Sequence, residues 1–95
     1  MVKKKGFQVV YIEWCDAARF NSQWVNLDEA VSWAQTDDWI IRQTGFVIKE
    51  TNKFLLLAAS VNPQHSNDVK VDGLLKIPKT WIRKRTTLAN IKITS

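Results

Sequence analysis

The feature that most constrains this chain is the segment at residues 40–61, in which two apolar runs flank a short polar turn. In the first run Phe46 and Ile48 alternate with their neighbours, the period-two pattern of a β-strand. The second run, residues 54–59, is apolar at every position, whereas an antiparallel strand usually keeps one face in water. The segment therefore predicts a β-hairpin whose second strand must be covered on both faces. Between the strands, Thr51-Asn52 forms the turn, where Asn can adopt the positive φ that a tight hairpin needs.

Size and composition predict one small domain with a real core. The chain has 95 residues and a mass of 11.0 kDa, and its five tryptophans supply large apolar side chains. The longest apolar run is far too short to span a bilayer, and one cysteine cannot form an internal disulfide. We therefore expect a reduced, cytoplasmic protein in which residues 1–95 form a single domain, with residues 1–6 as a flexible basic tail.

A strand and a helix are predicted before the hairpin. Residues 7–14 are typical of a first strand, with Val10, Ile12 and Trp14 on one face. Residues 15–23 are polar and irregular, which indicates a loop. A helix is then predicted from Asn26, which forms a capping box with Glu29, to an end at residues 37–38. Its apolar stripe comprises Leu27, Ala30, Val31 and Ala34, and we expect this stripe and the nearby tryptophans to pack against the sheet.

Two further strands are predicted after the hairpin. Residues 62–68 are turn formers, residues 69–77 carry apolar side chains at period two, and Pro78 ends that strand. A tight turn at residues 78–81 precedes a last strand at residues 82–93, with a break expected near residues 85–86. The predicted fold is mainly β: a five-stranded small barrel of the SH3-like kind, with one short helix inserted between the first and second strands.

The segment at residues 45–57, GFVIKETNKFLLL, resembles the first motif of Sm-like proteins, and the second motif would fall on residues 77–82. The resemblance covers residues 39–85. It implies a small barrel that assembles into a ring and binds RNA or DNA, with a role in their processing. It is similar to the divergent Sm-like barrels of bacteriophages and marine viruses, which would place the protein in a host cytoplasm. Pro78-Lys79 replaces the Arg-Gly pair of the second motif and Thr80 replaces its Asn, so no base-specific pocket is carried over.

The sequence offers little for catalysis or metal binding. Cys15 is followed directly by Asp16, but His65 is far away in the chain and nothing places the three together, so a partly buried structural cysteine is the better interpretation of Cys15. One His and one Cys cannot form a zinc site within one chain. The three glycines are far apart, so no phosphate-binding loop is present. We expect neither an enzyme nor a bound cofactor or metal.

Positive charge is concentrated in the second half of the chain. The formal charge is +5, and residues 76–92 contain six basic residues and no acidic one. A basic strip beside an aromatic side chain is typical of single-strand binding, although a solvated lysine-rich surface has the same composition. Trp81 is either a stacking platform or a core residue. The predicted nucleic-acid site consists of Lys76, Lys79, Trp81, Arg83, Lys84 and Arg85.

Self-association is predicted from the doubly apolar strand. A short helix cannot cover all of this strand, and an open sheet edge invites pairing with another copy. We expect a homo-oligomer, cyclic in form, with an interface at Phe54, Leu55, Leu57, Ala59 and Val61. The alternative is an SH3-like interaction module or viral accessory factor that binds a host protein through Trp24, Trp33 and Trp39, or that binds a small anionic ligand.

Overall fold

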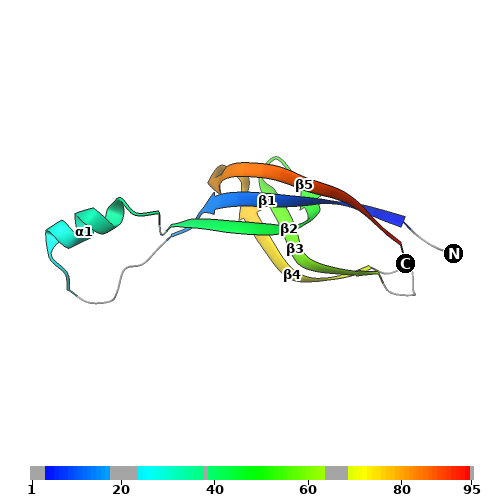
Figure 1. Cartoon of the computed structure of the whole chain (residues 1–95), viewed down its shortest axis with the longest axis horizontal. Helices are drawn as coiled ribbons and strands as arrows, with labels where there is room; N and C mark the ends of the chain where they lie inside the picture. The colour runs from blue at the N-terminus through cyan, green and yellow to red at the C-terminus, as the bar shows by residue number, and fades with distance from the viewer. Residues whose placement is uncertain (1–3, 18–23, 38, 64–68, 95) are drawn as a thin grey trace.

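The computed structural model describes residues 4–17, 24–37, 39–63 and 69–94. It contains five antiparallel strands in one sheet and one short helix, which confirms the predicted mainly β class and the place of the helix between the first two strands (Figure 1). The strand order is β4-β3-β2-β1-β5. The elements are β1 (Lys4–Cys15), α1 (Leu27–Ala34), β2 (Ile40–Glu50), β3 (Phe54–Pro63), β4 (Val69–Pro78), the 3₁₀ turn η1 (Lys79–Trp81) and β5 (Ile82–Thr94).

The sheet is not closed into a barrel. In the described part of the chain, β4 and β5 form its two edges, and no ladder of hydrogen bonds joins them. The turn η1 connects them covalently, and the Lys79 N–H donates to the Lys53 carbonyl at 2.9 Å. The expected closed barrel is therefore replaced by an open sheet whose edges are linked through a turn.

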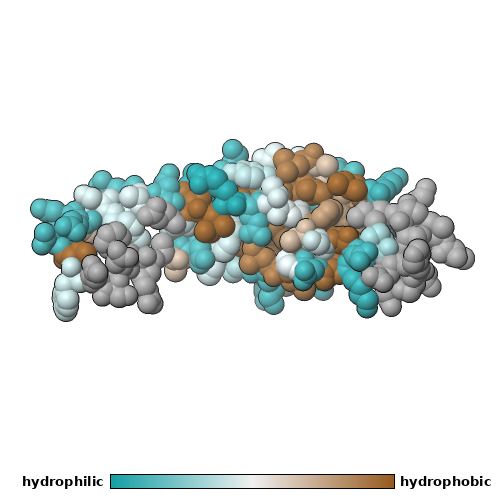
Figure 2. Space-filling model, turned by 60° about the horizontal axis from the view of Figure 1, so that its bottom comes forward, coloured by the Kyte–Doolittle hydropathy of each residue, from teal (hydrophilic) through white to brown (hydrophobic). Residues whose placement is uncertain are grey.

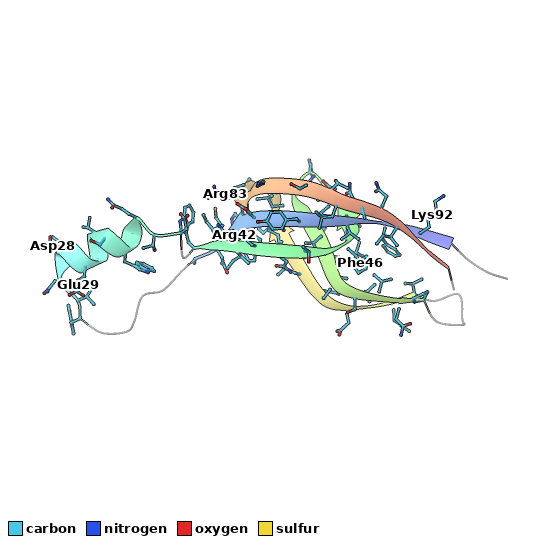
Figure 3. All side chains as sticks on the ribbon, in the orientation of Figure 1. Asp28, Glu29, Arg42, Phe46, Arg83 and Lys92 are labelled. Atoms are coloured by element: carbon cyan, nitrogen blue, oxygen red, sulfur yellow. The ribbon has the colours of Figure 1, made fainter. Side chains whose placement is uncertain are left out.

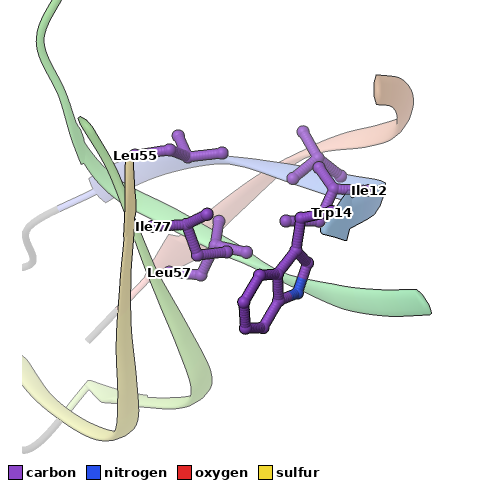
Figure 4. Close-up of a cluster of buried hydrophobic side chains, with 6 residues drawn as sticks. Ile12, Trp14, Leu55, Leu57 and Ile77 are labelled. Atoms are coloured by element: carbon purple, nitrogen blue, oxygen red, sulfur yellow. The ribbon is translucent and has the colours of Figure 1, made fainter. Parts of the chain in front are cut away.

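The sheet is curled around one small core. Val10, Ile12 and Trp14 of β1 cluster with Leu55 and Leu57 of β3, and with Ile77 of β4 (Figure 4). Because β2 lies between β1 and β3 in the sheet, these side chains meet only if the sheet bends across β2. The face of β1 predicted from the sequence is the face that fills this core.

The apolar strand β3 is buried on its core face by the sheet itself. Leu55 and Leu57 are almost fully buried, whereas Phe54 and Leu56 are half-buried. Opposite Leu56 and Leu57, β2 carries one extra residue, Ile48, which forms a bulge. The expectation that the helix shields part of the second face of β3 is wrong, since no residue of α1 is buried.

A glycine allows β4 to lie close against β3. Gly73 has φ of +66°, and a Cβ at this position would lie 2.7 Å from the Ala59 Cβ. Both the left-handed backbone and the contact with Ala59 exclude a larger side chain without rearrangement.

The segment that carries α1 projects away from the sheet (Figure 1). The β1–β2 ladder continues to the pair Cys15 and Ile40, so the connection between the strands starts beyond the core. The radius of gyration is 18.1 Å, against about 12 Å for a compact domain of this length. Within the described residues, no helix has the length and hydrophobicity that a membrane crossing requires.

The predicted start of the helix agrees with the structure, but its predicted end and contacts do not. Asn26 lies at the N-cap without a side-chain capping bond, so the expected capping box is absent. The helix ends at Ala34, before residues 37–38, and the Thr36 hydroxyl donates to the Trp33 carbonyl. The stripe of Leu27, Ala30, Val31 and Ala34 is exposed, because the projecting connection holds it beyond reach of the core.

Three local details also differ from expectation. The hairpin turn uses no positive φ at Asn52; instead the Thr51 hydroxyl accepts the Lys53 and Phe54 N–H groups at 3.1 Å. Residues 4–6, assigned to the tail, pair with β5, and residues 1–3 lie outside the described residues. The register of β5 against β1 shifts at Arg83 and at Leu88, rather than near residues 85–86.

Candidate nucleic-acid interface

Two of the six predicted site residues form ion pairs with a carboxylate of their own chain. The Arg85 guanidinium donates to both carboxylate oxygens of Glu50, at 2.8 and 3.0 Å, and to the Gln8 side-chain oxygen at 2.8 Å. Lys79 Nζ lies 2.6 Å from Glu50. Hydrogen bonds from Arg85 and Lys79 lower the pKa of Glu50 to about 2. Lys79 and Arg85 are thus committed to Glu50 and are poorly placed to neutralise a phosphate.

A second cluster brings together two predicted residues and three that the sequence did not indicate. Glu13 is mostly buried, and its carboxylate accepts a hydrogen bond of 2.6 Å from the Tyr11 hydroxyl. Arg42 Nε and Arg83 Nε lie 3.8 and 3.7 Å from the same carboxylate. Lys84 is directly opposite Glu13 in the β1–β5 ladder. We call Arg42, Arg83 and Lys84, gathered around Glu13, the basic cluster.

The electrostatics of the basic cluster leave an excess of positive charge. The hydrogen bond from Tyr11, followed by the charges of Arg42, Lys84 and Arg83, lowers the pKa of Glu13. The same hydrogen bond, which Tyr11 donates, raises the pKa of that phenol. Glu13 is therefore ionised at neutral pH and offsets only one of three nearby cations, and about half of the Arg42 and Arg83 side-chain surface faces solvent.

Trp81 is neither a core residue nor a free surface residue. Its indole stacks on that of Trp14, with ring centroids 6.4 Å apart and planes 11° apart, yet Trp81 is 45% exposed. Trp14 is 8% exposed, and its Nε1 has no hydrogen-bond partner among the described residues. The core tryptophan thus supports the half-exposed one, which lies two residues before Arg83. Figure 3 shows Arg42 and Arg83 together at the end of the sheet nearest α1.

Lys76 lies apart from this arrangement. Its Nζ is 5.4 Å from the centre of the Phe54 ring, in a cation–π contact on the β3–β4 hairpin. Of the six residues predicted from the sequence, the structure therefore places Trp81, Arg83 and Lys84 at one end of the sheet. Arg42 and Glu13 were missed because they are distant in the chain, and only the strand register brings them opposite one another.

The predicted oligomer interface is divided by the curl of the sheet. Leu55 and Leu57 are buried in the core of their own chain, so their side chains are not available to a second copy. Phe54 and Val61 are half-buried and Ala59 is exposed. The two free edges, β4 and β5, are the parts of the sheet that remain available for pairing.

The other residues considered for chemistry are not assembled in the described part of the chain. Cys15 is a half-buried free thiol, as expected, and Asp16 accepts a hydrogen bond from the adjacent Ala17 N–H. His65 lies outside the described residues. Trp24 is fully exposed and Trp39 is 47% exposed, so their expected packing against the sheet is wrong.

The fold and this surface define a small antiparallel β-protein with a basic, tryptophan-bearing end. Comparison with models of known protein families, with curated proteins and with solved structures finds no match for this chain.

Proposed function

We propose that this protein binds single-stranded nucleic acid, RNA or DNA, as a homo-oligomer of the Sm-like kind that takes part in RNA or DNA processing. One observation carries the proposal: the half-exposed, stacked Trp81 lies two residues before Arg83, which belongs to a basic cluster in which three cations surround one carboxylate. Single strands are bound by this combination of an aromatic platform for a base and cations for the phosphates.

The charge argument favours Arg42, Arg83 and Lys84 over the rest of the basic strip. Glu50 already binds Lys79 and Arg85 through short contacts, and Lys76 lies over Phe54. In the basic cluster the ion pairs to Glu13 are long, and both guanidinium groups are half-exposed. They therefore give up little interaction with Glu13 when they bind a phosphate.

The Sm-like class and the ring are part of the same proposal. They are supported by the motif-like hairpin at residues 45–57 and by the free edges of β4 and β5. Head-to-tail pairing of one edge with the other edge of the next copy either closes into a ring or extends into a filament. Light scattering of the wild-type protein at low micromolar concentration tests this part, and a mass of 11.0 kDa contradicts it.

Fluorescence titration with short oligonucleotides tests the binding itself. Three phosphate contacts give a slope of about −2 for the logarithm of affinity against that of salt concentration, at about −0.7 for each contact. The double variant Arg42→Glu/Lys84→Glu should lose binding. The variant Lys70→Glu/Lys92→Glu changes the net charge equally at exposed lysines outside the basic cluster and is the matched control.

Equal loss of affinity in both variants would show that only net charge matters and would contradict the assigned site. A second candidate function, an interaction module that binds a host protein, is favoured by the full exposure of Trp24 beside α1. If no oligonucleotide binds at any salt concentration, this candidate is favoured.

A further inference from the structure

We propose that the segment at residues 24–37, here called the arm, docks on the outer face of the sheet of a second copy of this chain. The outer face is the side of β1, β2 and β5 opposite the core. The inference rests on the self-association proposed above and names the contact that produces it. It does not depend on nucleic-acid binding.

The first argument is the exposure of the helix. Leu27, Ala30, Val31 and Ala34 form one apolar stripe of α1, and all four are exposed, as is Trp24 just before the helix. α1 has eight residues, whereas isolated helices shorter than about 12–15 residues are marginal in water and take most of their stability from packing. A helix of this length and pattern therefore needs a surface against which to pack.

The second argument is charge complementarity between the arm and the sheet. Residues 24–37 contain Asp28, Glu29 and Asp37 and no lysine or arginine. For the whole connection, residues 16–39, five acidic residues and one basic residue give a charge of −4, so the remainder of the chain carries +9. The opposite charges of the arm and the sheet favour docking of the arm of one copy on the sheet of another over contact between two arms or between two sheets.

The third argument is the composition of the receiving face. The strand register places Glu13, Arg42 and Lys84 in one cross-strand row, and Val9, Phe46 and Ala89 in a row farther along. Ile91, 39% exposed, lies opposite Phe7 farther along β5, and the apolar row continues beyond β2 through Ala58 to Leu74 of β4, 57% exposed. Figure 2 shows hydrophobic side chains gathered over the sheet part of the molecule. The face is thus basic at one end and apolar at the other.

The dimensions of the two surfaces agree. Arg42 and Phe46 are four residues apart on β2, which corresponds to about 13 Å along a strand. An eight-residue helix is about 12 Å long. α1 can therefore place Asp28, which lies in its first turn and flanks the apolar stripe, near the basic cluster while the stripe covers the row of Phe46.

A charge-exchange experiment tests the contact on the full-length chain. One variant, Asp28→Lys/Glu29→Lys, reverses the charge of two arm residues. The other, Arg42→Glu/Lys84→Glu, reverses the charge of two residues on the receiving face. Each variant alone should associate at least about tenfold more weakly than the wild type, because like charges oppose each other. An equimolar mixture of the two should recover association, since each arm then meets a face of opposite charge. Sedimentation velocity at low micromolar concentration measures all three samples.

The apolar part of the contact has its own variant and control. Leu27→Ser/Val31→Ser should reduce association to the same extent as the arm reversal, because it removes the exposed stripe without touching the core. Ser32→Ala, outside that stripe, should associate like the wild type. Circular dichroism of the monomeric variants checks that the sheet is retained.

Three results overturn the proposal. If all arm variants associate as strongly as the wild type, the association is due to the sheet edges alone. A mixture that stays monomeric would show that the arm binds another surface. A wild-type monomer would show that the arm folds back on its own sheet or remains unpaired. Oligonucleotide titration of the arm variants, which leave Trp81 and the basic cluster intact, shows separately whether the proposed function stands.

Discussion

Glu50 and Arg85, 35 residues apart in the chain, form a two-point ion pair across the curled sheet, with donor–acceptor distances of 2.8 and 3.0 Å. Glu50 ends β2 and Arg85 lies in β5, and β1 separates these strands in the sheet. Lys79 of η1 joins the same carboxylate. Glu50, Arg85 and Lys79 together therefore join β2, β5 and the turn η1, where no ladder within the described residues joins β4 to β5.

Because of this ion pair, the free energy of unfolding should depend on pH in the acid range. The pKa of Glu50 falls from 4.5 to about 2 because Arg85 and Lys79 hydrogen-bond its carboxylate. A carboxyl group whose pKa is depressed by folding stabilises the protein above its unfolded pKa. That stabilisation is lost as the pH falls from about 4.5 towards 2. After allowance for solvent screening, we expect a loss of about 1–3 kcal/mol.

Thermal unfolding of the wild type and of Glu50→Gln across this pH range measures the effect. The variant should be less stable at neutral pH, and its melting temperature should fall less steeply in acid. The remaining slope reports other carboxylates, including Glu13, whose pKa is also lowered. Parallel curves for the two proteins would refute the role given to Glu50.

Arg85 and Arg83 should respond differently to charge reversal. Arg85→Glu places a like charge against Glu50 and should cost about 1–3 kcal/mol of stability. Arg83 makes only a long contact of 3.7 Å with Glu13, so Arg83→Glu should leave the melting temperature nearly unchanged and lower oligonucleotide affinity. Equal melting temperatures for the two single variants would contradict this distinction.

Gly73→Ala should destabilise the protein. The residue has φ of +66°, and the added Cβ would lie 2.7 Å from that of Ala59, so we expect a loss of about 1–3 kcal/mol. Gly6→Ala is the matched control, because a Cβ there meets nothing within 4 Å of the described residues. Chemical denaturation of both variants provides the comparison. A similar change in the two proteins would show that the close approach of β3 and β4 is not needed.

Trp81→Ala should lower affinity more than stability. Loss of a stacked base costs about 1–3 kcal/mol of binding, and Trp81 is already half-exposed. Trp14→Ala, which empties a core site, should cost about 3–5 kcal/mol of stability. Parallel melting and oligonucleotide titration distinguish the two roles. Unchanged affinity in a folded Trp81→Ala protein would remove Trp81 from the proposed site.

Local sequence patterns predicted the elements well. The apolar runs of the hairpin predicted strands that begin at residues 40 and 54, as observed. Pro78 and the turn after it predicted the boundary between β4 and β5. The core face of β1 followed from Val10, Ile12 and Trp14 for the same reason, since alternation alone determines which side chains share a face.

Relations between distant residues were beyond the reach of these patterns. The stripe of α1 indicates that an apolar surface exists, but not that the ladder of Cys15 and Ile40 carries it away from the core. A run of basic residues in β5 indicates charge, but Glu50 and Glu13, far earlier in the chain, determine which cations remain available. Register and curl establish these relations, and neither is encoded by local periodicity.

The position of β1 between β2 and the edge strand β5 has a consequence for how the protein is made. β1 pairs with β5 from Lys4 opposite Thr94 to Trp14 opposite Ile82, so the first strand to be synthesised waits for the last. While β5 is still within the ribosome, β1 can pair only with β2, and its other side presents unpaired backbone groups. The contacts with the longest separation in the chain complete the sheet, a topology that slows folding. Chaperone protection during translation is therefore most needed at the open side of β1.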